Sequence, residues 1–128
     1  PLYSSAASDV YKRQGGHIVS GHVDGVGQIT RFEQVGESWE LCVVTPPTLG
    51  KYFAYKGSIT INGVSLTVNR VTDTPQGCEC SINLIPHTIE HTALGSLKAG
   101  SRVNLEIDLI ARYVERMLTA GAVPSSTL

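Results

Sequence analysis

The sequence has few charges and no excess of either sign. Only 16% of its 128 residues are charged, and ten Lys and Arg against eleven Asp and Glu give a net charge of −1. Proteins that bind the phosphate backbone of nucleic acids usually carry a basic excess, so this composition argues against a nucleic-acid partner. No apolar run approaches the roughly 18 residues of a membrane span, and we expect no membrane association.

Cysteine is also scarce, with three residues and no Cys-x-x-Cys pair. Three cysteines cannot all form disulfides, and their spacing suggests no thiolate zinc site. We therefore predict that they pack as small hydrophobic side chains in a reducing, cytoplasmic location. The glycine-rich stretch 21–27 lacks both the following helix and the Lys-Ser/Thr pair of a phosphate-binding loop.

The four histidines do not suggest a metal site. His17 and His22 are five residues apart, which places them on opposite faces of a regular strand. His87 and His91 could share one face of a short helix, but the sequence offers no evident third ligand. We expect no bound metal.

Residues 1–14 do not resemble the rest of the chain. They have no initiator Met, no helix or strand period, and no apolar core of a signal peptide. We interpret this segment as a translated cloning scar and predict that it is unstructured. The chain then starts abruptly at 15–16, as if a longer protein had been cut upstream.

Beyond residue 14 the sequence has the pattern of short strands separated by turn signals. Turn signals every eight to twelve residues favour a compact antiparallel barrel over residues 15–108. Short helices are predicted over 45–53 and 87–94. Strands are predicted over 17–23, 26–35, 39–44, 58–61, 64–71, 78–84 and 103–107.

The period changes in the last part of the chain, 109–128. Apolar residues there recur at i, i+3, i+4, i+7 and i+8, which is typical of a helix with one apolar stripe. The stripe consists of Ile110, Tyr113, Val114, Met117 and Leu118. We predict that Gly121 and Pro124 end the helix and that the stripe mediates oligomerisation. The alternative is that the helix folds back and covers an open end of its own barrel.

Four polar residues allow both a structural and a chemical interpretation. Ser65 and Thr67 share the polar face of strand 64–71, which is either an ordinary solvent face or a pair of hydroxyls offered to a ligand. Lys56 lies before Gly57, where a solvated lysine is the default. Asp108 lies where the last strand becomes the helix, a position at which Asp can cap the helix N-terminus.

Three blocks of sequence carry a family resemblance. They are GGHIVSGHV at 15–23, YKGSITINGVSLTV at 55–68, and NLIPHT at 83–88 continuing to TALG at 92–95. In this order and spacing they closely resemble the C-terminal half of riboflavin synthases of the alpha-chain type. The resemblance covers residue 15 to about residue 120.

The resemblance implies an all-β fold, a six-stranded antiparallel Greek-key barrel with short helices and a C-terminal amphipathic helix that forms a homotrimer. Family members contain two such barrels in tandem. This chain is similar to the second barrel and the helix, so the N-terminal barrel is expected to be missing.

The resemblance also implies a reaction. The family converts two molecules of 6,7-dimethyl-8-ribityllumazine to riboflavin and 5-amino-6-(ribitylamino)uracil without a metal or redox cofactor. Each barrel holds one lumazine, and the site lies between this barrel and the N-terminal barrel of a neighbouring subunit. We therefore expect the isolated chain to be inactive or weakly active. The alternative is a lumazine- or flavin-binding protein of the same fold that does not catalyse a reaction.

Site residues follow from the same resemblance. The positions that line the lumazine are occupied here by Lys56, Ser65, Thr67, Ile85 and Thr88. His22 and Asp108 occupy polar positions near the reacting centre, and with Ser65 they are the predicted catalytic residues. The pKa of an unperturbed histidine lies near neutrality, so His22 could act as an acid or base.

Overall fold

The computed structural model describes residues 13–14, 17–18 and 21–127. Most of the predicted scar, residues 1–12, therefore lies outside the described residues, as do 19–20 of the predicted strand 17–23. β1 (Arg13–Gln14) and β2 (His17–Ile18) pair as a short antiparallel ladder. Residues 21–24 are not in a strand, because Gly21 has a φ of +82° and turns the chain out of the extended conformation.

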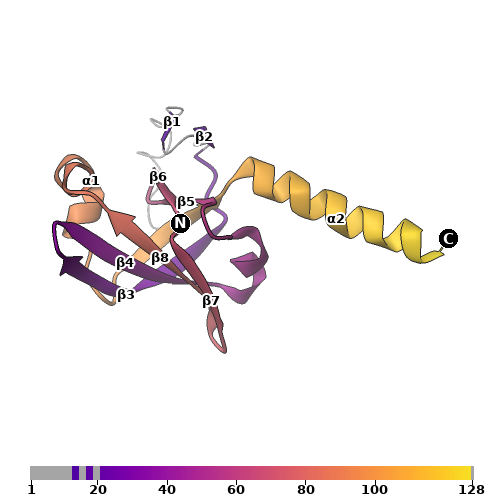
Figure 1. Ribbon diagram of the computed structural model, residues 1–128, viewed down its shortest axis with the longest axis horizontal. Helices are drawn as coiled ribbons and strands as arrows, with labels where there is room; N and C mark the ends of the chain where they lie inside the picture. The colour runs from indigo at the N-terminus through magenta and orange to yellow at the C-terminus, as the bar shows by residue number, and fades with distance from the viewer. Residues whose placement is uncertain (1–12, 15–16, 19–20, 128) are drawn as a thin grey trace.

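A seven-stranded antiparallel sheet forms the body of the protein (Figure 1). In sheet order its strands are β6 (Val64–Thr67), β5 (Ser58–Ile61), β9 (Arg102–Ile107), β3 (Gly25–Val35), β4 (Ser38–Thr45), β8 (Gly77–Leu84) and β7 (Arg70–Thr74). The outer strands β6 and β7 are separated in the chain by two residues, Val68 and Asn69. The sheet is therefore curled, because its two edge strands, β6 and β7, follow one another in the chain.

β6 and β7 act as one bent strand that changes partners. The Val68 N–H donates to the Gly57 carbonyl at 2.8 Å, next to β5, whereas the Asn69 N–H donates to the Ser81 carbonyl of β8 at 2.7 Å. Counted as one, they leave six strands, and β9 returns after β8 to lie beside β5, which is Greek-key order. The predicted all-β, six-stranded antiparallel Greek-key fold is confirmed.

The core is formed by the alternate side chains of the strands that point to the inside of the curled sheet. Inward-facing residues are completely buried on three central strands, namely Ile59 and Ile61, Val103 and Leu105, and Leu41 and Val43. Gly27 faces the same interior, where a Cβ would lie 2.9 Å from the side chains of Leu105 and Val43. Glycine is required there because the strands approach too closely for a side chain.

All three cysteines are buried and unpaired, as predicted. Burial raises the pKa of the Cys42, Cys78 and Cys80 thiols, most strongly that of Cys80. The thiols therefore remain protonated at neutral pH and pack as small apolar groups.

The short helices differ in detail from the prediction. The segment 45–53 contains a 3₁₀ helix, η2 (Pro47–Tyr52), and the segment 87–94 is divided between α1 (Pro86–His91) and a second 3₁₀ helix, η3 (Ala93–Ser96). Thr92 separates the last two. Its hydroxyl accepts a hydrogen bond from the Leu94 N–H at 3.2 Å, which favours a new helix start over continuation.

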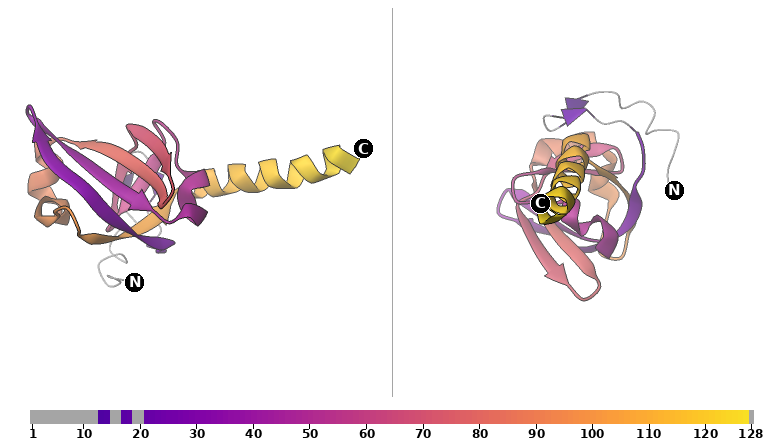
Figure 2. Two further views of the ribbon diagram at one scale, coloured as in Figure 1. Left: turned by 90° about the horizontal axis from the view of Figure 1, so that it is seen from below. Right: turned by 90° about the vertical axis from the view of Figure 1, so that its right-hand side faces the viewer.

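α2 (Leu109–Thr127) begins directly after β9 and extends away from the sheet (Figures 1 and 2). The predicted end at Gly121 and Pro124 is wrong, because both residues lie within the helix. Glycine lowers helix propensity without forbidding a helical φ, and the fixed φ of proline is itself close to helical. Within the described part of the chain, no helix is both long and apolar enough to cross a membrane.

The apolar stripe of α2 does not cover the barrel. Ile110, Tyr113, Met117 and Leu118 are each about two-thirds exposed, and Val114 is 46% exposed. Figure 2 shows the helix projecting from one end of the sheet instead of folding over it. The structure therefore contradicts the alternative in which the helix caps its own barrel.

Candidate ligand site

A pocket of about 390 Å³ opens at the bend between β6 and β7. It is lined by Tyr55, Lys56, Thr67, Val68, Asn69 and Asn83. Two predicted ligand residues, Lys56 and Thr67, thus lie in one pocket although they belong to different segments. The bend itself creates the opening, because there the chain leaves β5 and has just begun to pair with β8.

Lys56 has an unusual backbone conformation at the edge of this pocket. Its φ is +65°, a region that costs a non-glycine residue about 1–2 kcal/mol. Two hydrogen bonds hold the segment, from the Lys56 N–H to the Val68 carbonyl at 2.8 Å and from the Gly57 N–H to the Ala54 carbonyl at 2.9 Å. Strain of this kind persists where the surrounding structure imposes it, often at binding sites.

The Lys56 side chain supplies the positive charge of the pocket. Its ammonium group lies 5.5 Å from the centre of the exposed Tyr55 ring. Among the described residues, it forms no ion pair with a carboxylate. Its charge is therefore available to an electron-rich group of a ligand.

Ser65 lies beside the pocket but does not line it. It shares a strand face with Thr67, as predicted, yet only 5% of it is exposed. In register across the sheet, Ser65 is opposite Thr60 of β5, which is opposite Glu106 of β9, and all three are buried. β1 packs against the outer strand of this row, β6 (Figure 1).

The other predicted site residues are more dispersed. Ile85 is exposed and Thr88 is half-buried, and both lie where β8 leads into α1, two or more residues beyond Asn83. His22 is exposed before β3. Asp108 caps α2, since its Oδ1 accepts a hydrogen bond from the Ile110 N–H at 3.2 Å. None of these four lines the pocket.

Four lining residues were not predicted from the sequence, namely Tyr55, Val68, Asn69 and Asn83. Tyr55 and Asn83 each open one of the blocks that carry the family resemblance, and Asn69 continues the polar alternation of Ser65 and Thr67. Alternation and block position were therefore available signals. They do not show which residues meet, because the contact depends on where the strand bends.

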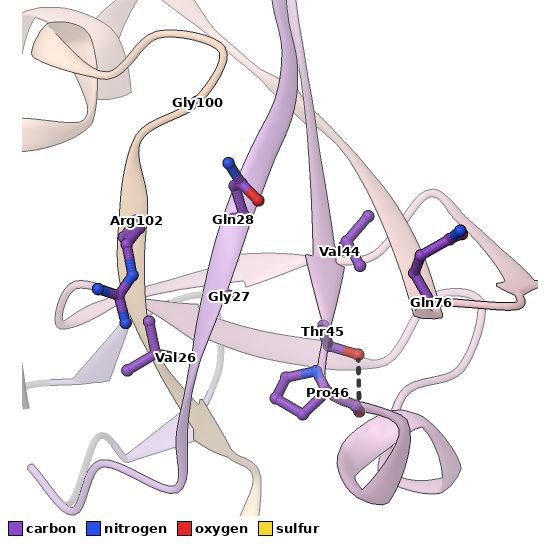
Figure 3. A pocket seen from close by; sticks show the side chains of 9 residues that line it. All are labelled: Val26, Gly27, Gln28, Val44, Thr45, Pro46, Gln76, Gly100 and Arg102. Carbon is purple, nitrogen blue, oxygen red and sulfur yellow. Dashed lines mark hydrogen bonds between the residues drawn. The ribbon is translucent and has the colours of Figure 1, made fainter.

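A second pocket, of about 340 Å³, lies on the outer side of β9, β3 and β4 (Figure 3). Gln28, Gln76 and Arg102 reach its rim from three different segments, over an apolar floor that includes Val26 and Val44. Gln28, Gln76 and Arg102 are exposed, and none of them was predicted to bind a ligand. We therefore take the pocket of Lys56 and Thr67 as the candidate site.

The histidine pair on α1 does share a face. The His87 and His91 ring centres lie 4.2 Å apart. Among the residues that the structure describes, no three His, Cys, Asp or Glu side chains come together in a way that could hold a metal ion.

Comparison with known families agrees with this fold. The lumazine binding domain matches residues 20–108, which include every strand of the seven-stranded sheet. The chain belongs to the lumazine-binding domain family. The match ends at Asp108, where α2 begins.

Full-length relatives of this lumazine-binding domain include bacterial riboflavin synthases. The riboflavin synthase of Actinobacillus pleuropneumoniae is 47% identical over 118 residues, which are 92% of this chain and 53% of the relative. Those of Photobacterium phosphoreum and Bacillus subtilis are 44% identical over 106 residues, 83% of this chain and 47% of each relative. The chain thus spans about half the length of the curated relatives it matches.

Solved structures of the protein LumP share the fold. LumP complexed with 6,7-dimethyl-8-(1'-D-ribityl) lumazine matches with a TM-score of 0.66 and 25% identity, over 75% of this chain and 52% of that one. LumP complexed with riboflavin matches with a TM-score of 0.64, also at 25% identity, over 74% of this chain and 48% of that one.

Proposed function

We propose that this chain is a lumazine-binding barrel of a riboflavin synthase and that it holds one 6,7-dimethyl-8-ribityllumazine in the pocket of Lys56 and Thr67. The observation that carries the proposal is the meeting of these two residues at the bend between β6 and β7. Riboflavin synthases at 44–47% identity support the enzyme family, and the LumP complex supports the ligand class.

The chemistry of the pocket suits a flat heterocycle with a polyol chain. Asn69 and Asn83 can each donate and accept hydrogen bonds at the edge of a pyrimidine ring, and the Thr67 hydroxyl can do the same. The Lys56 ammonium favours a carbonyl oxygen that carries partial negative charge, and the Tyr55 ring offers a face for stacking. A volume of about 390 Å³ is in the usual range for a small-molecule site.

In the proposed reaction, one bound lumazine transfers a four-carbon unit to a second one. Holding the two rings face to face supplies much of the rate, because proximity and orientation replace an unfavourable encounter in solution. We propose that this barrel binds one ring and that the N-terminal barrel of a neighbouring subunit binds the other. Ile85 and Thr88 are proposed to contact the ring from the end of β8.

His22, Ser65 and Asp108 are proposed to move protons near the reacting centre. Asp108 can combine this role with helix capping, because the capping bond uses one of its two carboxylate oxygens, Oδ1. Ser65 belongs to a buried polar row, so its hydroxyl would be held in one orientation. No metal or redox cofactor takes part in the proposed reaction.

We further propose that α2 assembles three copies of the chain. Its exposed apolar stripe is too regular for a solvated tail, and helices of this size need a surface to dock on. The cytoplasmic location stays a prediction from the unpaired cysteines.

Titration of the chain with 6,7-dimethyl-8-ribityllumazine, followed by fluorescence, tests the ligand proposal. We expect Thr67→Ala to weaken binding about fivefold, since a neutral hydrogen bond contributes about 1 kcal/mol, and Lys56→Met to weaken it about tenfold or more. Thr72→Ala, an exposed threonine of β7 outside the pocket, is the control. Unchanged affinity in both pocket variants would place the ligand elsewhere.

The similarity to LumP favours a second candidate, a protein that binds the lumazine without converting it. A measurement of riboflavin formation distinguishes the synthase barrel from the binding protein. A riboflavin synthase barrel should show little turnover alone and marked turnover after addition of an N-terminal barrel from a relative. A binding protein should show none in either case while its affinity for the lumazine is retained.

A further inference from the structure

α2 leaves the barrel with little apolar contact, yet its first turns are tied to the barrel by polar groups. Its residues Ala111, Arg112 and Glu115 are half-buried, whereas the stripe residues around them are exposed. Residues three and four apart share a helix face, so these three form the side that faces the barrel. The stripe lies on the remaining surface of the helix.

Asp24 is the centre of this attachment. It lies just before β3, and its Oδ2 accepts a hydrogen bond from the Ile107 N–H at the end of β9, at 2.7 Å. Its Oδ1 forms an ion pair with the Arg112 guanidinium of α2. One carboxylate therefore binds the last residue of the barrel and the first turn of the helix at the same time.

Two further contacts hold the same face of the helix against η2. The Arg112 guanidinium carbon lies 5.6 Å from the centre of the Tyr52 ring, within the range of a cation–π interaction. Lys51 Nζ lies 3.4 Å from Glu115 Oε1, one turn further along. The Asp24 and Arg112 side chains are 17% and 42% exposed, so their pair is better shielded from solvent than the Lys51–Glu115 pair at 55% and 27%.

We propose that Asp24 is a positioning residue for α2. By holding Ile107 and Arg112 together, it sets the direction in which the helix leaves the barrel and keeps the apolar stripe turned away from the barrel's own surface. The occupant of the stripe is a second copy of the chain, so this inference rests on the proposed assembly. Without the carboxylate, the helix would pivot about Asp108 and could lay its stripe on its own barrel.

The direction of the helix can be measured as a distance between spin labels. Glu37→Cys at the β3–β4 turn and Ala120→Cys on α2 are both exposed positions, and the three native thiols are buried and protonated, so they escape labelling. Labelled protein is diluted with unlabelled protein, so that double electron–electron resonance reports only distances within one chain. We expect one narrow distribution.

Arg112→Gln and Asp24→Asn should each broaden this distribution, and the double variant should broaden it no further than either single one. Association measured by sedimentation should weaken about fivefold, as for the loss of a partly exposed ion pair of about 1 kcal/mol. Arg116→Gln is the matched control, because Arg116 lies one turn later, is exposed, and forms no ion pair among the described residues.

An unchanged distribution in Arg112→Gln, or an equal change in Arg116→Gln, would overturn the proposal. If Asp24→Asn prevents folding through loss of the Ile107 hydrogen bond, the test rests on Arg112→Gln alone. The Arg112 side chain contacts Asp24 and Tyr52, which belong to the attachment of the helix. Lumazine affinity of the same variants is measured in parallel. A variant that keeps its affinity for the lumazine but changes the distance distribution supports positioning by Asp24. If the unmutated chain does not bind the lumazine at all, the proposed function is wrong, but the distance measurement still tests the role of Asp24.

Discussion

In the barrel, apolar side chains alternate inward and the curl of the sheet closes over them, whereas in α2 they form a stripe that faces away from the protein. Leu105 of β9 is completely buried, and Ile110, five residues later, is 67% exposed. The same hydrophobic effect acts on both. The barrel completes its core with its own strands, whereas the helix leaves its apolar stripe exposed.

This difference suggests that the barrel folds independently of the helix. The polar contacts of Asp24, Arg112, Lys51 and Glu115 join the two regions, and half-buried Ala111 is the α2 side chain that packs against the core. Stability should therefore depend on barrel residues, and assembly on helix residues.

The largest expected effect separates these two properties directly. Leu105→Ala should lower the free energy of unfolding by about 3–4 kcal/mol, because it leaves a cavity in a closed core. Ile110→Ala should change it by less than about 0.5 kcal/mol. Both are measured by urea unfolding at low protein concentration, where association contributes little. A large loss in the Ile110 variant would show that the helix is part of the barrel's core.

The next effect concerns assembly. Val114→Glu combined with Met117→Glu should weaken association by about 2–3 kcal/mol, roughly a hundredfold, while barrel unfolding stays the same. Sedimentation should then show smaller particles that retain their near-ultraviolet circular dichroism. Arg116→Glu, which introduces the same charge beside the stripe, is the control. Equal loss of assembly in the control would indicate charge repulsion instead of lost apolar contact.

A smaller effect compares backbone strain in the two regions. Lys56→Gly should stabilise the barrel by up to about 1 kcal/mol, because glycine adopts a φ of +65° without steric cost, while ligand affinity falls with loss of the ammonium. Gly121→Ala should raise the helix signal at 222 nm and leave barrel unfolding unchanged. No gain in stability from Lys56→Gly would mean that the surrounding hydrogen bonds remove the strain.

The smallest effect concerns thiol chemistry. At pH 8 the native cysteines should not react with an aromatic disulfide reagent, whereas Thr119→Cys on α2 should react at once. Burial raises the folded pKa of the three thiols above the unfolded value of about 8.5. Below that pH both states are protonated, so stability is unaffected, and it falls as pH rises above it. Cys80→Ala should reduce this fall between pH 8 and 10.

Much of the fold could be predicted from local pattern. The pattern of short strands between turn signals predicted the strand of Ile59 and Ile61, both completely buried in the structure, and the other strands of the sheet in the same way. The bend at Val68 and Asn69 was not predicted, because the alternation of 64–69 runs through it and breaks only at Arg70 and Val71, after the pairing partner has changed from β5 to β8. Periodicity indicates which face of a strand is buried but not which strand pairs with it.

The candidate site was likewise predicted in part from the sequence and decided in part by the tertiary structure. Family blocks identified Lys56, Ser65 and Thr67, and alternation placed the two hydroxyls on one face. Burial then separated Ser65 from Thr67, because Ser65 lies in a covered row with Thr60 and Glu106 that only cross-strand register brings together. Glycine and proline signals also misplaced the end of α2, since they express preferences that a helix can override.

By itself, the sequence determined the two periods of this protein, a period of two that builds a barrel and a period of 3.6 that builds one apolar helix stripe. It also determined which apolar residues lie inside the barrel and which form the stripe of α2. Only the tertiary structure decided where the sheet closes, which polar residues share a pocket, and in which direction α2 points. These depend on contacts such as Asp24 with Arg112, 88 residues apart, and no local pattern encodes a distance between segments that meet only after folding.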